Sequence, residues 1–289
     1  MTKYSRIIQG CMHWGNWGKN FDTNSIVEMM HHCIDNGITT FDHADIYGDY
    51  TTEEAFGHAF AKADIDRSAI ELISKCGIQY KAQSRPENLV KHYQYDADYI
   101  VKSTERSLRL LQTEYLDLLL LHRPSPLMRP DEIAKAIDQL QQQGKIKAFG
   151  VSNFTPSQTA LLQTTTAVTA NQIEISLTAH QSLFDGTLDH MQTHRITPMS
   201  WSPLGSFFKE NNPQTQRIDK VLERLTTKYE LSKDQLLLAW LLRHPSRIHP
   251  VIGTATKERI TAAAAVKDVI LERQDWFALL VASQGHKVP

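Results

Sequence analysis

The sequence lacks most features that mark secreted, membrane-spanning or nucleic-acid-binding proteins. Its 289 residues include only three cysteines, and this odd number without a CxxC pair argues against a disulfide framework. The longest apolar runs, such as Leu118–Leu121, are far shorter than the ~20 residues needed to cross a bilayer. Lys and Arg number 31 against 32 Asp and Glu, so no overall charge attracts nucleic acid or an anionic membrane. Because no apolar signal-peptide core follows the first residues, we expect a cytoplasmic globular protein.

Two common nucleotide-binding motifs are also missing. The sequence contains no G-x-G-x-x-G turn and no P-loop, and a doubly wound dinucleotide-binding sheet normally carries the first of these after an early strand. A doubly wound sheet is therefore the less favoured of two possible α/β folds.

Short apolar or β-branched runs alternate with segments of helical period along the whole chain. The predicted strands are Arg6–Cys11, Thr39–Ala44, Glu71–Lys75, Leu116–His122, Ala148–Ser152, Ala170–Ser176, Thr197–Pro203 and Pro250–Gly253. The predicted helices are Ser25–Asn36, Thr52–Ala61, Asp96–Leu111, Asp131–Gln143, Pro156–Gln163, Thr187–His194, Arg217–Tyr229, Lys233–Arg243, Lys257–Val266 and Arg273–Ser283. Parallel strands need crossover connections, and α/β barrels of ~250 residues form one domain. The pattern predicts a (β/α)8 TIM barrel, with residues 1–289 as a single domain and polar loops at Gln79–Asn88 and Asn211–Thr215.

Ionisable residues follow three successive strands of this predicted barrel. Asp42 and Tyr47 follow the second strand, Lys75 ends the third and His122 ends the fourth. Taken singly, each has an ordinary structural explanation as a solvated side chain or a loop hydrogen-bonding group. Together they would face one another across the mouth of the barrel, where functional groups gather, and a buried charge there needs a partner.

The motifs around these residues resemble the aldo-keto reductase superfamily. F-D-H-A-D-I-Y-G, I-S-K-C-G, L-L-L-L-H-R-P, G-V-S-N-F, N-Q-I-E-I, W-S-P-L-G and V-I-G-T-A-T-K-E-R-I occur in the family's order and cover almost the whole chain. Within the superfamily, H-A-D-I-Y-G-D-Y and H-R-P-S-P-L-M most resemble the YdhF-like bacterial oxidoreductases. The resemblance implies NADPH-dependent reduction of an aldehyde or ketone to an alcohol.

By this resemblance, Asp42, Tyr47, Lys75 and His122 form a catalytic tetrad. Tyr47 would be the general acid that protonates the substrate oxygen during hydride transfer. Because a tyrosine has a reference pKa of about 10, we expect the ammonium group of Lys75 to lower the pKa of Tyr47. Asp42 would keep Lys75 charged and oriented, and His122 would orient or donate to the carbonyl oxygen.

The same resemblance distributes the cofactor contacts over the other strand ends. Gly10, Cys11 and Met12 would lie near the nicotinamide ribose, and Ser152, Asn153 and Gln172 would bind the carboxamide. Trp201 would stack on the nicotinamide ring, and Ser202, Leu204 and Gly205 would follow the pyrophosphate. Gly253, Thr254, Lys257 and Arg259 would form the last part of the site, with a pocket for the 2′-phosphate of NADPH. Ala262 and Ala263 stand where family members commonly place Glu and Asn, so adenine recognition is expected to be looser.

The substrate is not defined by the sequence. We expect Trp14, Trp17, Tyr50 and Arg123 to line its pocket. Arg123 could bind an acidic substrate or pair with a loop carboxylate. The last predicted helix could pack beside the pocket or cap the barrel, and both alternatives remain open.

A metal-dependent hydrolase would be a different chemistry for the same strand ends. His43 and Asp45 lie near Asp42, and His122 comes from another strand. Zinc sites need three protein ligands of fixed geometry and supporting partners, which the spacing of Asp42 and Asp45 around one turn does not favour. The sequence therefore predicts no metal.

A binding module is the second alternative. Some proteins that resemble this family bind NADPH as regulatory or redox-sensing subunits with little turnover. A sensor does not need a proton donor, so the complete tetrad favours an enzyme. We expect a small-molecule carbonyl substrate, no nucleic-acid or membrane partner, and a monomer or weak oligomer.

Overall fold

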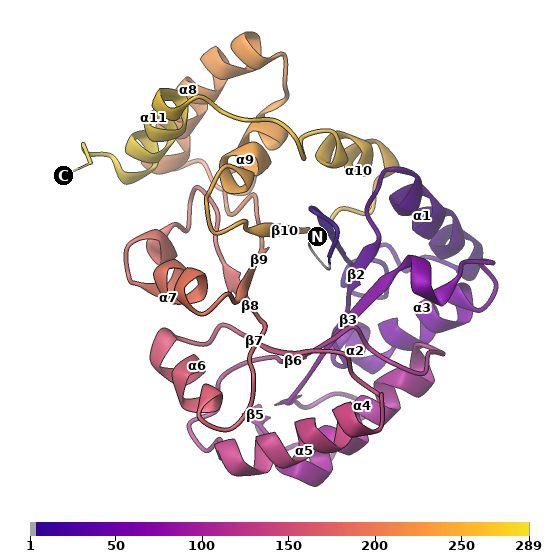
Figure 1. The fold of residues 1–289 in the computed structure, drawn as a ribbon. Coiled ribbons are helices and arrows are strands. Elements are labelled where there is room, and N and C mark those ends of the chain that lie inside the picture. The colour runs from indigo at the N-terminus through magenta and orange to yellow at the C-terminus, as the bar shows by residue number, and fades with distance from the viewer. Residues whose placement is uncertain (1–3, 289) are drawn as a thin grey trace.

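Eight parallel strands close into a barrel, and helices surround it (Figure 1). The computed structural model describes residues 4–288, so the ends of the expected range 1–289 lie outside it. The strands are β1 (Ile8–Gly10), β2 (Thr40–Asp42), β3 (Glu71–Cys76), β6 (Leu118–Leu121), β7 (Phe149–Ser152), β8 (Ala170–Glu174), β9 (Thr197–Trp201) and β10 (His249–Ile252). Each follows its predecessor around the ring, and β1 closes it by pairing with β10 through Ile8–Val251 and Gln9–Ile252. The predicted TIM barrel is confirmed.

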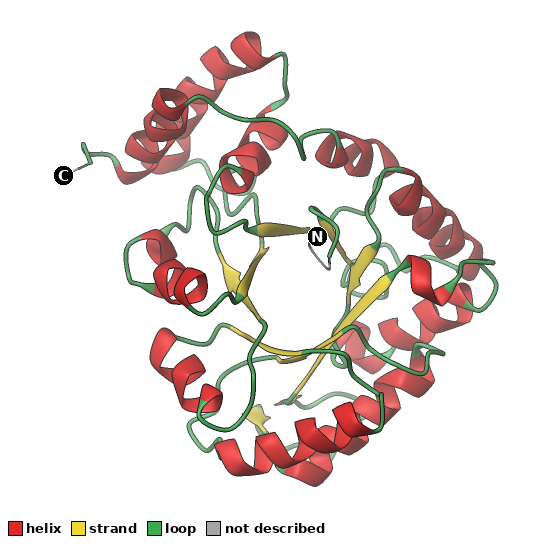
Figure 2. Cartoon of the chain, in the orientation of Figure 1, coloured by secondary structure: helices red, strands yellow, loops and turns green. Residues whose placement is uncertain are grey.

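The helices form an outer layer around the strands (Figure 2). They are α1 (Thr23–Asp35), α2 (Tyr47–Tyr50), α3 (Thr52–Phe60), α4 (Ala97–Leu110), α5 (Pro130–Gln142), α6 (Pro156–Gln163), α7 (Thr187–Thr193), α8 (Pro213–Tyr229), α9 (Lys233–Leu242), α10 (Lys257–Ala264) and α11 (Arg273–Gln284). Local capping explains several starts: Asp22 accepts a hydrogen bond from the Ser25 backbone before α1, and Thr155 and Gln158 form a capping box before α6. Within residues 4–288, no helix combines the length and the apolar character needed to cross a bilayer.

The strand β6 shows why the barrel strands appear in the sequence as continuous apolar runs. Leu118 and Leu120 belong to the cluster that fills the inside of the barrel, whereas Leu119 and Leu121 belong to the cluster beneath the surrounding helices. A parallel strand is thus buried on both faces, and side chains close the centre of the barrel. Loops at the ends of the strands remain as the place for a site.

One of the two loop predictions is largely confirmed, and the other is wrong in part. Residues 80–88 of the expected loop Gln79–Asn88 connect Ile78–Gln79 (β4) to His92–Tyr93 (β5), and these two strands pair antiparallel as a small hairpin. Asn211–Thr215 was expected to be another loop, but α8 begins at Pro213 because Asn212 and Thr215 form a reciprocal cap. The hairpin and the cap are short local structures that the apolar period does not encode.

Candidate active site

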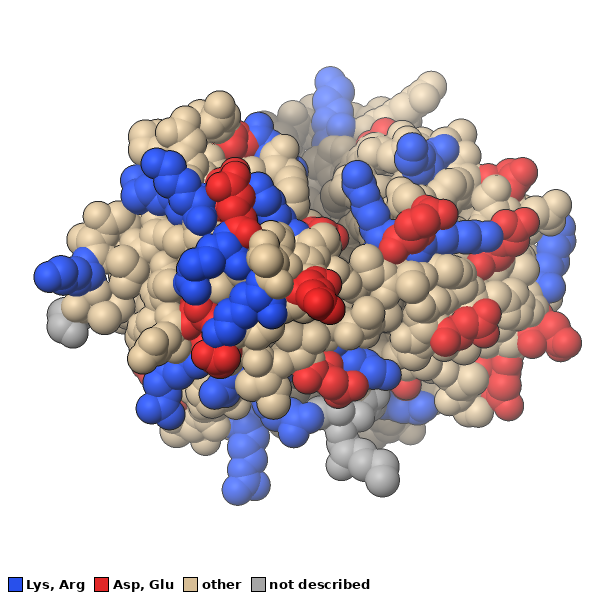
Figure 3. Space-filling model, turned by 90° about the horizontal axis from the view of Figure 1, so that it is seen from above, with Lys and Arg blue, Asp and Glu red and all other residues tan. Residues whose placement is uncertain are grey.

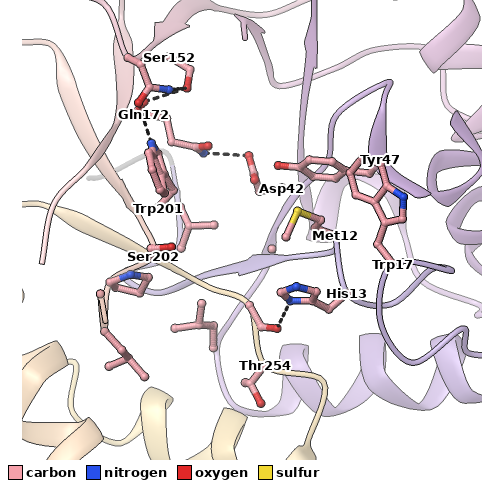
Figure 4. Close-up of a pocket in the computed structure, with 18 of the residues that line it drawn as sticks. Met12, His13, Trp17, Asp42, Tyr47, Ser152, Gln172, Trp201, Ser202 and Thr254 are labelled. Atoms are coloured by element: carbon pink, nitrogen blue, oxygen red, sulfur yellow. Dashed lines mark hydrogen bonds between the residues drawn. The ribbon is translucent and has the colours of Figure 1, made fainter. Parts of the chain in front are cut away.

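A cavity of about 630 Å³ opens where the strands end (Figure 4). Most of the residues expected at the site line it. From the expected set these are Gly10, Met12, Trp17, Asp42, Tyr47, His122, Arg123, Ser152, Asn153, Gln172, Trp201, Ser202, Leu204, Gly205, Gly253, Thr254 and Arg259. They come from all parts of the chain, and the closed barrel brings them together.

Lys75 is buried behind the cavity lining and contacts Asp42 and Tyr47, which do line the cavity. Lys75 Nζ donates to Asp42 Oδ1 and Oδ2 at 2.8 and 2.7 Å, to the His43 carbonyl oxygen at 2.8 Å and to Tyr47 Oη at 3.1 Å. Lys75 and Asp42 are only 1% and 2% exposed. Gln172 Nε2 adds a hydrogen bond of 3.0 Å to Asp42 Oδ1, which Figure 4 shows beside the Tyr47 hydroxyl. Each carboxylate oxygen of Asp42 therefore has a donor.

The register of the strands explains this arrangement. Asp42 is the partner of Ile73 across β2 and β3, and Ile73 belongs to the cluster inside the barrel. Lys75 lies two residues further along β3, so its side chain points to the same inner face as that of Ile73. Tyr47 reaches this point from the loop after β2.

The backbone after Tyr47 makes an unusual turn. Gly48, Asp49 and Tyr50 all have positive φ angles, of 59, 55 and 70°. Two successive non-glycine residues in this region are strained. At Gly48 a Cβ would lie 2.4 Å from Thr52 Oγ1, so a side chain does not fit there. The turn reverses the chain directly after Tyr47 and sends Tyr50 away from the cavity.

Burial strongly affects the protonation of Tyr47 and Lys75. It raises the pKa of Tyr47, while the charge of Lys75 lowers it and that of Asp42 raises it, and the net direction is upward. Lys75 therefore acts on the Tyr47 pKa in the expected direction, but desolvation of the tyrosinate outweighs its attraction. Burial alone lowers the pKa of Lys75, but Asp42 and Tyr47 more than offset this, so the pKa is raised and Lys75 stays charged.

His122 is the neutral member of the group. Its ring lies edge-on to that of Tyr47, with the centroids 6.1 Å apart. Burial lowers its pKa well below the usual value, and the positive charges of Lys75, Arg123 and Lys91 lower it further. His122 can therefore donate or accept a hydrogen bond but does not supply a positive charge near neutral pH.

A second polar network forms the opposite wall of the cavity. Ser152 Oγ donates to the Gln172 carbonyl oxygen at 2.9 Å, and Asn153 Nδ2 donates to Ser152 Oγ at 2.8 Å. Trp201 Nε1 donates to Asn153 Oδ1 at 2.9 Å, which fixes the edge of the indole ring (Figure 4). Asn153 has a positive φ of 62°, a conformation that asparagine tolerates better than most residues. Amide, hydroxyl and indole groups are thus held in fixed positions on one side of the cavity.

Some expected site residues lie elsewhere. Trp14 is buried in the hydrophobic core, where its ring lies 6.1 Å from that of Phe41 and 6.3 Å from that of Phe56. Tyr50 stacks on Tyr80 at 5.4 Å, outside the cavity.

Two expected cofactor contacts and the last helix also lie outside the cavity. Cys11 is fully buried, and Lys257 forms an ion pair of 2.9 Å with Glu28 on α1. No residue of α11 lines the cavity, and Trp276 of this helix stacks on Trp240 at 5.0 Å. Residue type alone therefore does not predict which of these side chains line the cavity. The path of each loop decides which of them reach it.

Sequence reasoning also missed part of the lining. The additional residues are His13, Ile46, Ile78, Lys91, Pro203, Lys209, Asp234, Leu238, Val251 and Ile252. Ala263, expected beside the adenine, also lines the cavity. Some adjoin expected residues, as His13 adjoins Met12, and His13 Nδ1 lies 3.1 Å from the Gly253 carbonyl oxygen. Lys91 comes from the β4–β5 hairpin, whose position no periodic pattern signals.

Behind the tetrad, the carboxyl groups of Asp45 and Glu53 are buried close together. Asp45 Oδ2 accepts from Ser103 Oγ at 3.2 Å, and Glu53 accepts from Ser74 and Ser107 at 2.6 and 3.0 Å. Burial and the nearby charge of Glu53 raise the pKa of Asp45 to about 8. Asp45 therefore keeps its proton at neutral pH in the folded chain.

Asp45→Asn is expected to stabilise the protein more as the pH rises. The pKa of this carboxyl group is about 3.9 in the unfolded chain and about 8 in the folded chain. Between these two pH values only the folded state holds the proton. The free energy of unfolding of the wild type therefore falls as the pH rises, by at most ~1.4 kcal/mol per pH unit. The variant loses this dependence, so its advantage in free energy of unfolding should grow across that window. Urea titrations at several pH values check this. The exposed Asp98→Asn serves as control, and an advantage that does not change with pH would contradict the assignment.

The metal alternative receives no support from the side-chain arrangement. Among residues 4–288, no three His, Cys, Asp or Glu side chains are grouped so that they could hold a metal ion. His43 packs edge-on against Phe56 at 4.3 Å, and burial lowers its pKa to about 3. Asp42 is already bound by Lys75 and Gln172.

Comparison with known proteins identifies the family. The family model described as "Aldo/keto reductase family" matches residues 6–279. Oxidoreductase YdhF of Escherichia coli is 43% identical over 99% of this chain and 96% of its own length, which confirms the resemblance to the YdhF-like oxidoreductases. The 6-dehydroglucose reductase of Agrobacterium fabrum is 41% identical, over 98% and 96%. A solved aldo/keto reductase from Klebsiella pneumoniae, in complex with NADP and acetate, is 26% identical with a TM-score of 0.78, over 99% and 93%. The chain is an oxidoreductase that belongs to the aldo/keto reductase family.

Proposed function

We propose that the chain reduces an aldehyde or ketone of a small molecule to an alcohol, with NADPH as the hydride donor. The observation that carries the proposal is the position of Lys75 Nζ, within 3.1 Å of the Tyr47 hydroxyl and bound to both oxygens of Asp42. A proton donor that lines the cavity therefore has a fixed, buried positive charge directly behind it. Carbonyl reduction needs both, because negative charge develops on the substrate oxygen.

Each residue of the tetrad then has a distinct role. The cofactor, when bound, supplies a hydride to the carbonyl carbon. Tyr47 gives its hydroxyl proton to the carbonyl oxygen, and its raised pKa keeps that proton available near neutral pH. Lys75 stabilises the tyrosinate that remains, and Asp42 holds Lys75 in place. His122, being uncharged, orients the carbonyl oxygen by a hydrogen bond.

The residues on the far wall fit a nicotinamide nucleotide. The Ser152, Asn153 and Gln172 side chains offer donors and acceptors for a carboxamide, and Trp201, which would stack on the nicotinamide ring, lines the same cavity. Gly205 N donates to the Ser202 carbonyl oxygen at 2.7 Å, and this tight turn after β9 lines the cavity where a pyrophosphate would lie. Solved relatives support this cofactor, including the Klebsiella pneumoniae enzyme in complex with NADP.

Arg259 is expected to select NADPH over NADH. It lines the cavity from α10, and no ion pair engages it among the described residues. A guanidinium group binds a phosphate through charge-assisted hydrogen bonds but gains little from a bare hydroxyl. Arg259→Ala should raise the KM for NADPH roughly 10- to 100-fold while the KM for NADH changes little. Steady-state kinetics with both cofactors checks this, with the exposed Arg273→Ala as control. Equal effects on the two cofactors would reject the role.

The function is tested by NADPH oxidation, followed by absorbance, with a panel of aldehydes and ketones. The panel includes 6-dehydroglucose, because a relative 41% identical to this chain is named for its reduction. Steady turnover with at least one carbonyl compound supports the proposal. Tight NADPH binding without turnover on any of them would instead favour a regulatory, NADPH-sensing role.

A further inference from the structure

Four basic residues line the cavity without an ion pair among residues 4–288: Arg259, Lys209, Arg123 and Lys91. The last two lie near His122. Arg123 follows His122 directly, and Lys91 lies in the β4–β5 hairpin. Within residues 4–288, neither side chain forms an ion pair. The sequence left open whether Arg123 pairs with a loop carboxylate, and the structure shows no such pair. Of the acidic residues that line the cavity, Asp42 is bound to Lys75 and Asp234 lies on α9.

The surface as a whole does not explain these cations. Acidic and basic side chains are intermingled over the face seen in Figure 3, and the net charge of the chain is only −1. A pair of unmatched cations beside the reactive group is therefore a local property of the cavity. Such a pair attracts an anion more strongly in a partly enclosed site than on an open surface.

The backbone of Arg123 is held in place by hydrogen bonds to a buried tyrosine. Tyr95 Oη donates to the Arg123 carbonyl oxygen at 2.6 Å and accepts from the Arg123 backbone N–H at 3.2 Å. Tyr95 fits there because Gly77 has no side chain: a Cβ on Gly77 would lie 2.0 Å from Tyr95 Cε1. The Arg123 guanidinium lies 5.5 Å from the centre of the Trp201 ring. The Tyr95 hydroxyl thus holds both the N–H and the carbonyl group of Arg123, and Arg123 lines the cavity.

Both cations lie near His122. Arg123 is the next residue in the chain, and the charges of Arg123 and Lys91 both lower the pKa of His122. Apolar side chains of Trp17, Ile46 and Ile78 line the same cavity. The cavity therefore combines the reactive group with nearby positive charge and apolar lining.

We propose that the natural substrate carries a carboxylate in addition to its aldehyde or ketone group, and that Arg123 and Lys91 bind this carboxylate. The fork of the guanidinium group matches the two oxygens of a carboxylate. Lys91 adds a second charge without fixed geometry. The proposal rests on the carbonyl reduction proposed above and names its substrate class.

The test compares para-carboxybenzaldehyde with its methyl ester, with NADPH as cofactor. The wild-type kcat/KM should be higher for the acid than for the ester by about tenfold or more, as expected for a charge-assisted hydrogen bond. Arg123→Gln should reduce this ratio about tenfold, and Lys91→Gln should also reduce it. Arg129→Gln is the matched control, because Arg129 follows the same strand but is exposed and pairs with Asp131. This control should leave the ratio unchanged.

A binding measurement separates recognition from chemistry. Calorimetry with the product para-(hydroxymethyl)benzoate and the oxidised cofactor should give tighter binding to the wild type than to Arg123→Gln. The corresponding benzamide should bind the two proteins alike. If no carbonyl compound of the panel is reduced, the proposed function fails. If acid and ester are reduced equally well, or if Arg123→Gln keeps the wild-type ratio, only the carboxylate proposal fails.

Discussion

Tyr47→Phe is expected to remove nearly all carbonyl reduction while the cofactor still binds. The substitution deletes one hydroxyl group, the one that Lys75 Nζ contacts at 3.1 Å. A general acid contributes roughly 10²- to 10⁴-fold to a rate, so kcat should fall by about that factor. The ring itself remains, so the packing of Trp17 against Tyr47, with centroids 6.3 Å apart, should persist.

Two measurements decide the role of Tyr47. Single-turnover oxidation of NADPH by an aldehyde gives the chemical rate, and titration of protein fluorescence by NADPH gives the affinity. Tyr115→Phe is a suitable control because Tyr115 lies near Arg67 and Lys147, outside the cavity. A Tyr47→Phe protein that reduces aldehydes at the wild-type rate would show that another group is the acid.

Lys75→Met is expected to lower both activity and stability. Lys75 and Asp42 form a buried ion pair of 2.7 Å, with their side chains 1% and 3% exposed. Removing one partner of such a pair leaves an uncompensated buried charge and costs about 3–5 kcal/mol. The free energy of unfolding, measured by urea titration, should fall by that amount, and turnover should fall with it.

The double variant Asp42→Asn/Lys75→Met separates the two effects. It has no unpaired charge, so it should regain most of the lost stability. It still lacks the cation beside Tyr47, so it should stay inactive. If the double variant is as unstable as Lys75→Met, the loss arises from packing. If it regains activity, Lys75 has no part in the chemistry.

The barrel could be predicted because its signals are periodic. Each barrel strand is a short buried run such as that of β6, and parallel strands require crossover segments between them. The ends of these strands follow directly, so Asp42, Lys75 and His122 could be placed near one another before the structure was known. In a closed barrel the carboxyl ends of all strands lie at one mouth, so these residues are expected there.

The loops could not be predicted in the same way. Trp14 and Trp17 are three residues apart in one loop, yet Trp14 packs into the core and Trp17 lines the cavity. Tyr50 follows a left-handed turn at Gly48–Tyr50 and stacks on Tyr80 outside the cavity. Lys257 is neutralised by Glu28, a partner 229 positions away in the chain. Each of these positions depends on a tertiary contact or on one backbone conformation. Neither produces a periodic pattern in the sequence.

The cavity is complete only when β1 pairs with β10, so it can form only after β10 has been synthesised. Gly10 and Gly253 both line the cavity, and the His13 side chain reaches the Gly253 carbonyl oxygen only when these two strands are paired. A ribosome-bound chain that has emerged only as far as β9 lacks this side of the cavity. Nucleotide affinity should therefore arise only after β10 is released. Because a ligand stabilises the folded state to which it binds, bound nucleotide should protect chains whose barrel has closed from proteolysis.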